Sequence, residues 1–213
     1  MTHTADVADR DFLEIIFGPA TSVRTYLNLL YLLLAFPTGV AYFIFLTTGL
    51  SLGFSLLIIF IGLPILVVVL SACWALGAFE RIIARSMLGI PIPSPPPLDA
   101  TGFWPRLKAL FGSVTTWKTF GYLMLKFPFG VASFCVLTTA FSFSISLILA
   151  PFLYNVVPID FGLWRVDNKD EATVWCLIGV VLLILSFHLV NGLALVWGRF
   201  AQIMLGPDPP AGR

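Results

Sequence analysis

The sequence predicts an all-α, polytopic membrane protein with four transmembrane helices, arranged as two tandem duplicated helical hairpins with short interfacial helices. Three observations predict this fold: an apolar composition, long intervals without charge, and an internal repeat. Of the 213 residues, 59% are hydrophobic and 11% are charged, whereas a soluble domain averages about 45–50% and about 25%. The composition therefore excludes a soluble globule, and the lipid bilayer is the expected partner of the apolar surface. The net charge of +1 gives no reason to expect a nucleic-acid partner.

The four spans follow from the intervals that contain no Asp, Glu, Lys or Arg. Thr25–Phe79 has 55 such residues, Phe127–Ile159 has 33, and Ala172–Gly198 has 27. Because a hydrocarbon core about 30 Å thick is crossed by about 20 helical residues, the first interval holds two spans and each of the others holds one. We place the spans at about residues 38–60, 65–86, 129–150 and 173–198.

The spans and the stretches between them divide the chain into five parts. Two of these parts are hairpin repeats, and the second repeat contains a long external loop. A Pro-rich linker with an interfacial segment joins the hairpins, and cytoplasmic segments flank them. In chain order the parts are the N-terminal segment 1–21, hairpin repeat 22–90, linker 91–111, hairpin repeat 112–206 with its external loop 151–171, and tail 207–213.

The distribution of Lys and Arg predicts the orientation, because these residues concentrate on the cytoplasmic side of a membrane. Ten of the twelve precede the first span, lie between or flank the second and third, or follow the fourth; Arg165 and Lys169 lie in the external loop. We therefore expect both termini and the linker on the cytoplasmic side of the cell membrane. Acidic residues near the start, among them Asp6 and Asp9, argue against a cleaved signal peptide, so the first span is expected to be retained.

An internal repeat relates the two hairpins. Tyr31–Thr48 and Tyr122–Thr139 begin 91 residues apart and are identical at 12 of 18 positions. The ends of the hairpins also match, as ARSMLG at Ala84–Gly89 and AQIMLG at Ala201–Gly206. Because each copy contains an even number of spans, we expect the copies to be related by a pseudo-two-fold axis along the membrane normal.

Prolines and small residues recur at equivalent places in the two copies. We expect a break or kink at Pro37 and Pro128, because proline removes a backbone donor, with the segments before them lying obliquely at the cytoplasmic interface. Small residues four apart allow helices to approach closely. We expect them to form a contact between the two hairpins, or alternatively a homodimer face; they are Gly49, Gly53, Ala140 and Ser144.

Polar side chains within the spans are the candidate binding residues, because polar groups are costly in hydrocarbon. They are a duplicated threonine pair and two residues on one face of the last span: Thr47, Thr48, Thr138, Thr139, His188 and Asn191. For each of them the alternative is a hydrogen bond within or between helices. Glu80 and Arg81, at the cytoplasmic end of the second span, are expected to pair or to extend toward the interface.

The sequence offers no motif for catalysis, metal binding or cofactor binding. It contains no paired carboxylates, zinc-protease helix motif, nucleotide-binding loop or catalytic triad. The cysteines Cys73, Cys135 and Cys176 lie in apolar runs without metal-ligand spacing, and we expect them to be buried small residues. We therefore expect no enzymatic activity, no cofactor and no metal site.

Three segments of the sequence are distinctive: the duplicated FPxGV motif, the GLSLGFSLLIIFIGLP segment of Gly49–Pro64 and the FERIIARSMLG segment of Phe79–Gly89. They resemble the putative sensor domain family, which is the four-helix membrane module of many bacterial and archaeal sensor histidine kinases and also occurs as free-standing small membrane proteins. The resemblance covers about residues 22–206. It implies signal reception at the membrane and provides no catalytic residues.

The resemblance and the scarcity of charge together suggest a non-enzymatic sensor or regulatory module. We expect it to perceive an apolar or envelope-derived cue and to signal through a partner, such as a histidine kinase or transcription regulator of a two-component system encoded nearby. Gly206 and Pro207 are expected to end the last helix, and no kinase domain is expected after them. The alternatives are a small transporter or lipid-handling protein, or a structural subunit of a membrane complex.

Overall fold

Four long helices form most of the part of the chain that the computed structural model describes, which is residues 18–95, 102–153 and 168–206. No strand occurs within those ranges. The N-terminal segment before Gly18, part of the linker, most of the external loop and the tail after Gly206 lie outside the described residues. The all-α fold class is therefore confirmed for the described chain.

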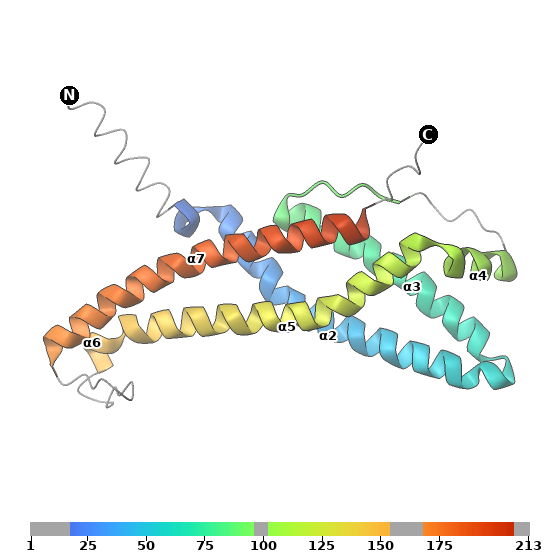
Figure 1. Cartoon of the computed structure of the whole chain (residues 1–213), viewed down its shortest axis with the longest axis horizontal. Helices are drawn as coiled ribbons and strands as arrows, with labels where there is room; N and C mark the ends of the chain where they lie inside the picture. Colours follow the sequence, from blue (N-terminus) through green and yellow to red (C-terminus); the bar gives the residue numbers. More distant parts are fainter. Residues whose placement is uncertain (1–17, 96–101, 154–167, 207–213) are drawn as a thin grey trace, which may run out of the picture. The chain divides into compact units, whose positions relative to one another are not determined.

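The long helices are α2 (Val23–Ser55), α3 (Gly62–Ile83), α5 (Val114–Ile148) and α7 (Lys169–Leu205), labelled in Figure 1. Each belongs to a segment that is long and apolar enough to cross a membrane, so the prediction of four transmembrane helices is confirmed. Shorter helical pieces complete the order: η1 (Leu56–Ile59), η2 (Ala84–Leu88), α4 (Phe103–Gly112) and α6 (Ala150–Leu153).

The helices continue through the repeated prolines. Pro37 lies inside α2 and Pro128 lies inside α5, so neither proline ends its helix. The expectation of a break is therefore wrong, because the preceding segments are the first turns of the same helices, whereas a kink and an oblique position at the interface stay predictions. A proline interrupts the backbone ladder locally, whereas in hydrocarbon every other backbone group still needs a helical partner.

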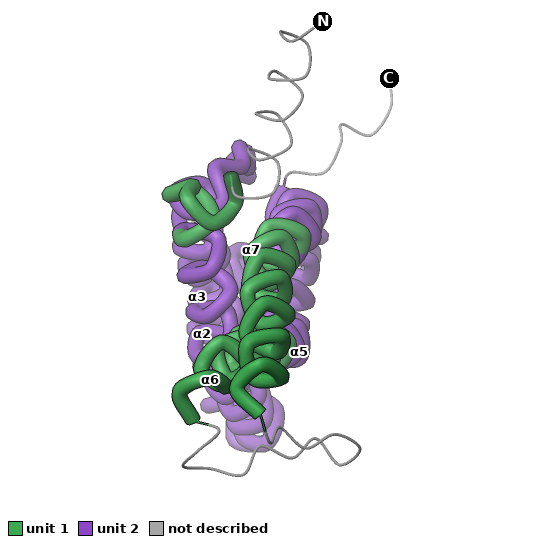
Figure 2. Tube along the Cα trace, turned by 90° about the vertical axis from the view of Figure 1, so that its left-hand side faces the viewer, with its two compact units in different colours: residues 1–26, 135–192 green, residues 27–134, 193–213 purple. Residues whose placement is uncertain are grey.

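The chain forms two compact units, and the boundary between them crosses α2, α5 and α7 partway along each helix (Figure 2). One unit contains residues 1–26 and 135–192, and the other contains residues 27–134 and 193–213. Each unit therefore combines two segments that are far apart in the sequence. Each unit is described separately below, and we call them unit 1 and unit 2 in that order.

In unit 2, the small residues of α2 pack against α3. A Cβ atom on Gly49 would lie 2.6 Å from Cγ2 of Val69, and one on Gly53 would lie 2.5 Å from Cδ2 of Leu66. A side chain at either position would therefore require Val69 or Leu66 to shift. The contact lies within the first hairpin, between consecutive helices, and differs from the expected contact between the two hairpins.

The connection between α2 and α3 is a tight turn. Phe60 has a φ of 61°, in the left-handed region, which is uncommon for a residue other than glycine. Gly62 follows, where a Cβ atom would collide with the carbonyl oxygen of Gly53. The turn therefore returns the chain so closely that the start of α3 touches the end of α2.

The linker after α3 packs within unit 2. Gly89, with a φ of 63°, ends the η2 turn, and the Arg85 guanidinium donates to the carbonyl of Ile92 and, at 3.3 Å, to Oγ of Ser94. Ile92 is buried, and the side chain of Ile90 fills the space where Gly198 of α7 has no Cβ. This stretch of the Pro-rich linker is thus held against the helices.

Candidate functional site

In unit 2, α2 and α5 approach each other at the repeated FPxGV motif. A Cβ atom on Gly39 would lie 2.8 Å from the carbonyl oxygen of Lys126, and one on Gly130 would lie 2.6 Å from that of Ala35. Gly39 and Gly130 are 91 residues apart, and so are Ala35 and Lys126. The two close approaches are therefore the same contact made once by each copy of the motif.

Two pairs of stacked phenylalanine rings repeat this relation. Phe36 stacks on Phe134 and Phe43 stacks on Phe127, each pair with ring centroids 4.8 Å apart and interplanar angles of 24° and 26°. A shift of 91 residues converts Phe36 into Phe127 and Phe43 into Phe134, so it exchanges the two pairs. Stacked pairs add about 0.5–1.5 kcal/mol each beyond burial of their area, and here they fix the crossing from both sides.

Two tyrosines that are themselves 91 residues apart meet in this region. The hydroxyl oxygens of Tyr31 and Tyr122 lie 3.2 Å apart, and both side chains are buried. The 91-residue shift converts the first residue into the second, so the pair joins equivalent positions of the two copies. It therefore lies where the equivalent parts of α2 and α5 face each other.

A carboxylate from α3 completes the site. Glu80 accepts a hydrogen bond from the Tyr42 hydroxyl on Oε1 (2.8 Å) and another from the Tyr122 hydroxyl on Oε2 (3.3 Å). The Lys126 ammonium donates to Oε2 and forms an ion pair with it. The Lys126 nitrogen also lies 5.5 Å from the ring centroids of both Tyr31 and Tyr42. We call Tyr31, Tyr42, Glu80, Tyr122 and Lys126 the buried polar cluster.

The ion pair of the buried polar cluster is enclosed by protein. Glu80 is 0% exposed and Lys126 is 2% exposed. Removing two charges from water costs several kcal/mol per ion, which only good geometry and further hydrogen bonds offset. The two tyrosine hydroxyls provide those bonds to the carboxylate, and the two tyrosine rings provide cation–π contacts to the ammonium. The pair joins α3 of the first hairpin to α5 of the second.

The counterpart of the Tyr42–Glu80 hydrogen bond in the other copy is neutral. Nε1 of Trp197 donates to Oγ of Ser133 at 2.9 Å, and both side chains are buried. Ser133 is Tyr42 shifted by 91 residues. Trp197 is Glu80 shifted by 117 residues, which is the shift between the matching hairpin ends at Ala84 and Ala201. The crossing is therefore near-symmetric in its phenylalanines and glycines and asymmetric in its charge.

The Glu80–Lys126 ion pair was not predicted. We expected Glu80 to pair with Arg81 or to extend toward the interface, and this is wrong, because Glu80 is buried and pairs with Lys126 of α5. The error follows from the proline argument, which placed Lys126 outside the membrane-spanning helix. One signal was present: Lys126 replaces Ala35 in a segment that otherwise matches closely between the copies.

None of the four threonines belongs to the buried polar cluster. All four side chains, Thr47, Thr48, Thr138 and Thr139, are exposed on α2 and α5. On helices of this apolarity an exposed position is one that lipid covers, and threonine can satisfy its hydroxyl on its own helix. Cys135 is also exposed, contrary to the expected burial, whereas Cys73 is buried as expected.

His188 and Asn191 lie on α7 in unit 1 and make separate contacts. His188 is exposed, and its Nδ1 lies 3.0 Å from the carbonyl oxygen of Ile184, one turn earlier. Asn191 is half-buried and donates from Nδ2 to Oγ1 of Thr25 at 3.1 Å. These contacts are of the kind that the alternative interpretation predicted, hydrogen bonds within a helix and between helices.

One family model matches the chain. Its description is "Putative sensor", and the match extends over residues 31–205. The chain belongs to the putative sensor family. The match includes both copies of the FPxGV motif and all five residues of the buried polar cluster, so the predicted family is confirmed. No curated protein and no solved structure matches the chain.

Proposed function

We propose that this member of the putative sensor family is a non-enzymatic regulatory module of the cell membrane, with both termini in the cytoplasm. It perceives an apolar or envelope-derived cue and signals through a partner protein, such as a histidine kinase or a transcription regulator. The family match supports the sensor role. The single structural observation that supports it most is the enclosed Glu80–Lys126 ion pair, which joins the two hairpins at their crossing.

The enclosure of the ion pair favours signalling over catalysis. A catalytic carboxylate or amine must reach a substrate, whereas Glu80 and Lys126 are surrounded by tyrosine side chains and helix backbone. Their ionic groups instead hold α3 and α5 in one arrangement. Packed interfaces with such contacts tend to switch between discrete arrangements. A cue can then shift the protein only if it binds one arrangement more tightly than the other.

Transport is the second candidate, and the same ion pair is the reason to keep it. Ionisable residues within membrane-spanning helices frequently mark the paths of ions or substrates. In a small transporter or lipid-handling protein, the pair would open during the transport cycle. As a third role, a structural subunit of a membrane complex would use the exposed aromatic side chains of the spans as contacts with other chains.

Complementation in the host organism tests the sensor function. In a strain without the gene, the transcriptional response to membrane-perturbing compounds is compared after restoring the wild-type gene, Lys126→Met, or Thr138→Val. Thr138 is exposed on the same helix, so its variant is the matched control. We expect wild type and Thr138→Val to restore the response and Lys126→Met, at equal membrane abundance, to alter it. An identical response with and without the gene would contradict the sensor role.

Proteoliposomes separate the sensor from the transporter. The purified full chain is reconstituted, and the movement of fluorescent phospholipid between leaflets is followed by dithionite quenching. We expect the same rate as in protein-free vesicles. A faster rate that Lys126→Met reduces would favour lipid handling. In situ cross-linking in native membranes then identifies the partner, and recovery of a kinase or regulator with wild type supports signalling through it.

A further inference from the structure

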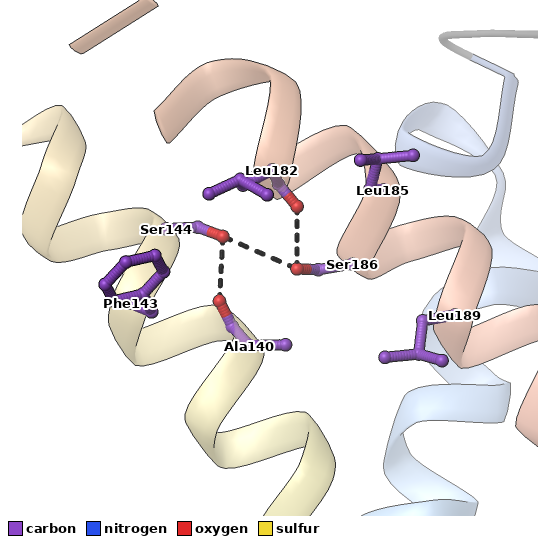
Figure 3. A pocket seen from close by; sticks show the side chains of 7 residues that line it. All are labelled: Ala140, Phe143, Ser144, Leu182, Leu185, Ser186 and Leu189. Atoms are coloured by element: carbon purple, nitrogen blue, oxygen red, sulfur yellow. Dashed lines mark hydrogen bonds between the residues drawn. The ribbon is translucent and has the colours of Figure 1, made fainter. Parts of the chain in front are cut away.

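A groove between α5 and α7 in unit 1 contains none of the residues of the buried polar cluster. Its volume is about 320 Å³, at the lower end of the range typical for small-molecule sites. Its lining residues occur at helical spacings, so each helix contributes one face. They are Ala140, Phe143 and Ser144 of α5, and Leu182, Leu185, Ser186 and Leu189 of α7, shown in Figure 3.

Two serine hydroxyls face each other between the walls of the groove (Figure 3). Oγ of Ser144 donates to the carbonyl of Ala140 at 2.7 Å, and Oγ of Ser186 donates to the carbonyl of Leu182 at 2.8 Å. The two hydroxyl oxygens are 3.5 Å apart. A hydroxyl has one proton and two acceptor lone pairs, and a serine that donates to its own helix keeps its lone pairs for other donors. The serines therefore present acceptors to an occupant.

The serines are the buried polar part of an otherwise apolar groove. Ser144 is 1% exposed and Ser186 is 4% exposed, whereas Phe143, Leu185 and Leu189 are exposed. At one end the helices touch, because a Cβ atom on Gly179 would lie 2.9 Å from the carbonyl oxygen of Ser144. The groove thus has a closed end, a polar floor and an apolar rim.

The rim lies within helices that are long and apolar enough to cross a membrane. A molecule that enters between Phe143 and Leu185 therefore comes from the hydrocarbon phase and must itself be apolar. A plain acyl chain would fill the walls and leave the serine acceptors without a donor. An occupant with an apolar body and one hydroxyl group would satisfy both the walls and the floor.

We propose that this groove binds a membrane-resident lipid alcohol, with its apolar body against the leucines and its hydroxyl donating to Ser144 or Ser186. This inference rests on the proposed function, because it gives the apolar cue a site and a chemical class. Ser144 lies in α5, the helix that also carries Lys126 of the buried polar cluster. The groove and the buried polar cluster therefore share helix α5.

Photolabelling with matched probes tests the proposal. The full chain is reconstituted in phosphatidylcholine nanodiscs and irradiated with a diazirine-bearing C16 alcohol or with its methyl ether, which cannot donate. Mass spectrometry then quantifies labelling of the peptides that contain residues 140–144 and 182–189. We expect the alcohol to label them about fivefold more than the ether, the ratio that corresponds to one net hydrogen bond, and unlabelled hexadecanol to compete. Equal labelling by both probes would overturn the proposal.

Variants of the lining residues locate the binding. Ser144→Ala/Ser186→Ala should reduce alcohol labelling to the level of the ether, and Ala140→Leu, which fills the groove, should reduce labelling by both probes. Ser146→Ala is the control, because Ser146 is exposed on the same helix and makes the same kind of bond, to the carbonyl of Ser142 at 2.8 Å. Unchanged labelling in the double serine variant, with a wild-type unfolding curve, would also overturn the proposal.

The result is independent of the complementation experiment. Selective labelling together with a normal transcriptional response in the deletion strain would support the lipid-alcohol site and reject the sensor function. A lost response together with equal labelling by the two probes would support the sensor function and reject this site. The two proposals can therefore fail separately.

Discussion

The hydroxyl oxygens of Tyr31 and Tyr122 lie 3.2 Å apart, although 91 residues separate them in the sequence. Each residue is the counterpart of the other in the repeated segment, and the stacked phenylalanines Phe36–Phe134 and Phe43–Phe127 are exchanged by the same shift. The contacts between the two copies thus follow the same 91-residue repeat as the sequence. The stability of this crossing can be tested residue by residue.

Neutralising one member of the ion pair should be more harmful than neutralising both. Lys126→Met leaves the Glu80 carboxylate buried without its counter-charge, and we expect a loss of about 3–5 kcal/mol in the free energy of unfolding. Glu80→Gln/Lys126→Met should lose less than the Lys126→Met variant, because no charge remains. Unfolding in mixed micelles by added SDS measures all three proteins. An additive double variant would show that the two side chains do not interact.

The Tyr42 hydroxyl should contribute more than an ordinary tyrosine hydroxyl. It donates to the buried Glu80 carboxylate at 2.8 Å, and hydrogen bonds to charged groups contribute about 1.5–3 kcal/mol. We expect Tyr42→Phe to reduce the free energy of unfolding by this amount. Tyr26→Phe is the control, since the exposed Tyr26 donates to the neutral carbonyl of Ala20 at 2.8 Å. Equal effects of the two substitutions would count against an ionised carboxylate in the cluster.

The glycines of the FPxGV motif should tolerate no side chain. A Cβ atom at Gly39 or Gly130 would lie 2.8 or 2.6 Å from a backbone oxygen of the other helix, and the backbone cannot move aside as a side chain can. We expect Gly39→Ala and Gly130→Ala to lower the thermal unfolding temperature strongly. Gly192→Ala is the matched control, because nothing lies within 4 Å of its Cβ position. It should be neutral or stabilising, by up to about 1 kcal/mol of helix propensity.

Trp197 of α7 and Ser133 of α5 should be energetically coupled through their hydrogen bond. Trp197→Phe and Ser133→Ala each remove one partner of the 2.9 Å hydrogen bond. We expect their effects on the free energy of unfolding to be non-additive by about 0.5–1.5 kcal/mol, the net value of such a bond. A double-mutant cycle in the same mixed micelles measures this coupling. Strict additivity would mean that the indole and the hydroxyl do not interact in the membrane.

The sequence predicted the helix count and the family, because both depend on long apolar stretches. It did not predict the buried polar cluster. The span estimate used about 20 residues for each helix, whereas α2, α5 and α7 have 33, 35 and 37 residues. Helices of this length include positions that the estimate had placed outside the membrane. Lys126 and Tyr122 are among them, and tertiary contacts alone place them beside Glu80.

The polar residues that the sequence did predict as candidates show that the direction of a side chain could not be predicted. The threonine pairs at Thr47 and Thr138 are near mid-span, yet their side chains are exposed. Depth in the membrane can be read from sequence position, whereas the direction in which a side chain points depends on which helix packs beside it. The same reason explains why the partners of Gly49 and Gly53 lie on α3 rather than in the other hairpin.

The residues that the repeat places opposite Glu80 and Lys126 are Trp197 and Ala35, which carry no charge, and this inequality has a mechanical consequence. A symmetric dimer of one hairpin would carry two ion pairs or none, and tilting either subunit would meet equal resistance. In this chain only one side of the crossing carries an ionic restraint. Separating α3 from α5 there would break an ion pair, whereas separating α7 from α2 at the equivalent positions would break none, so the two separations differ in energy.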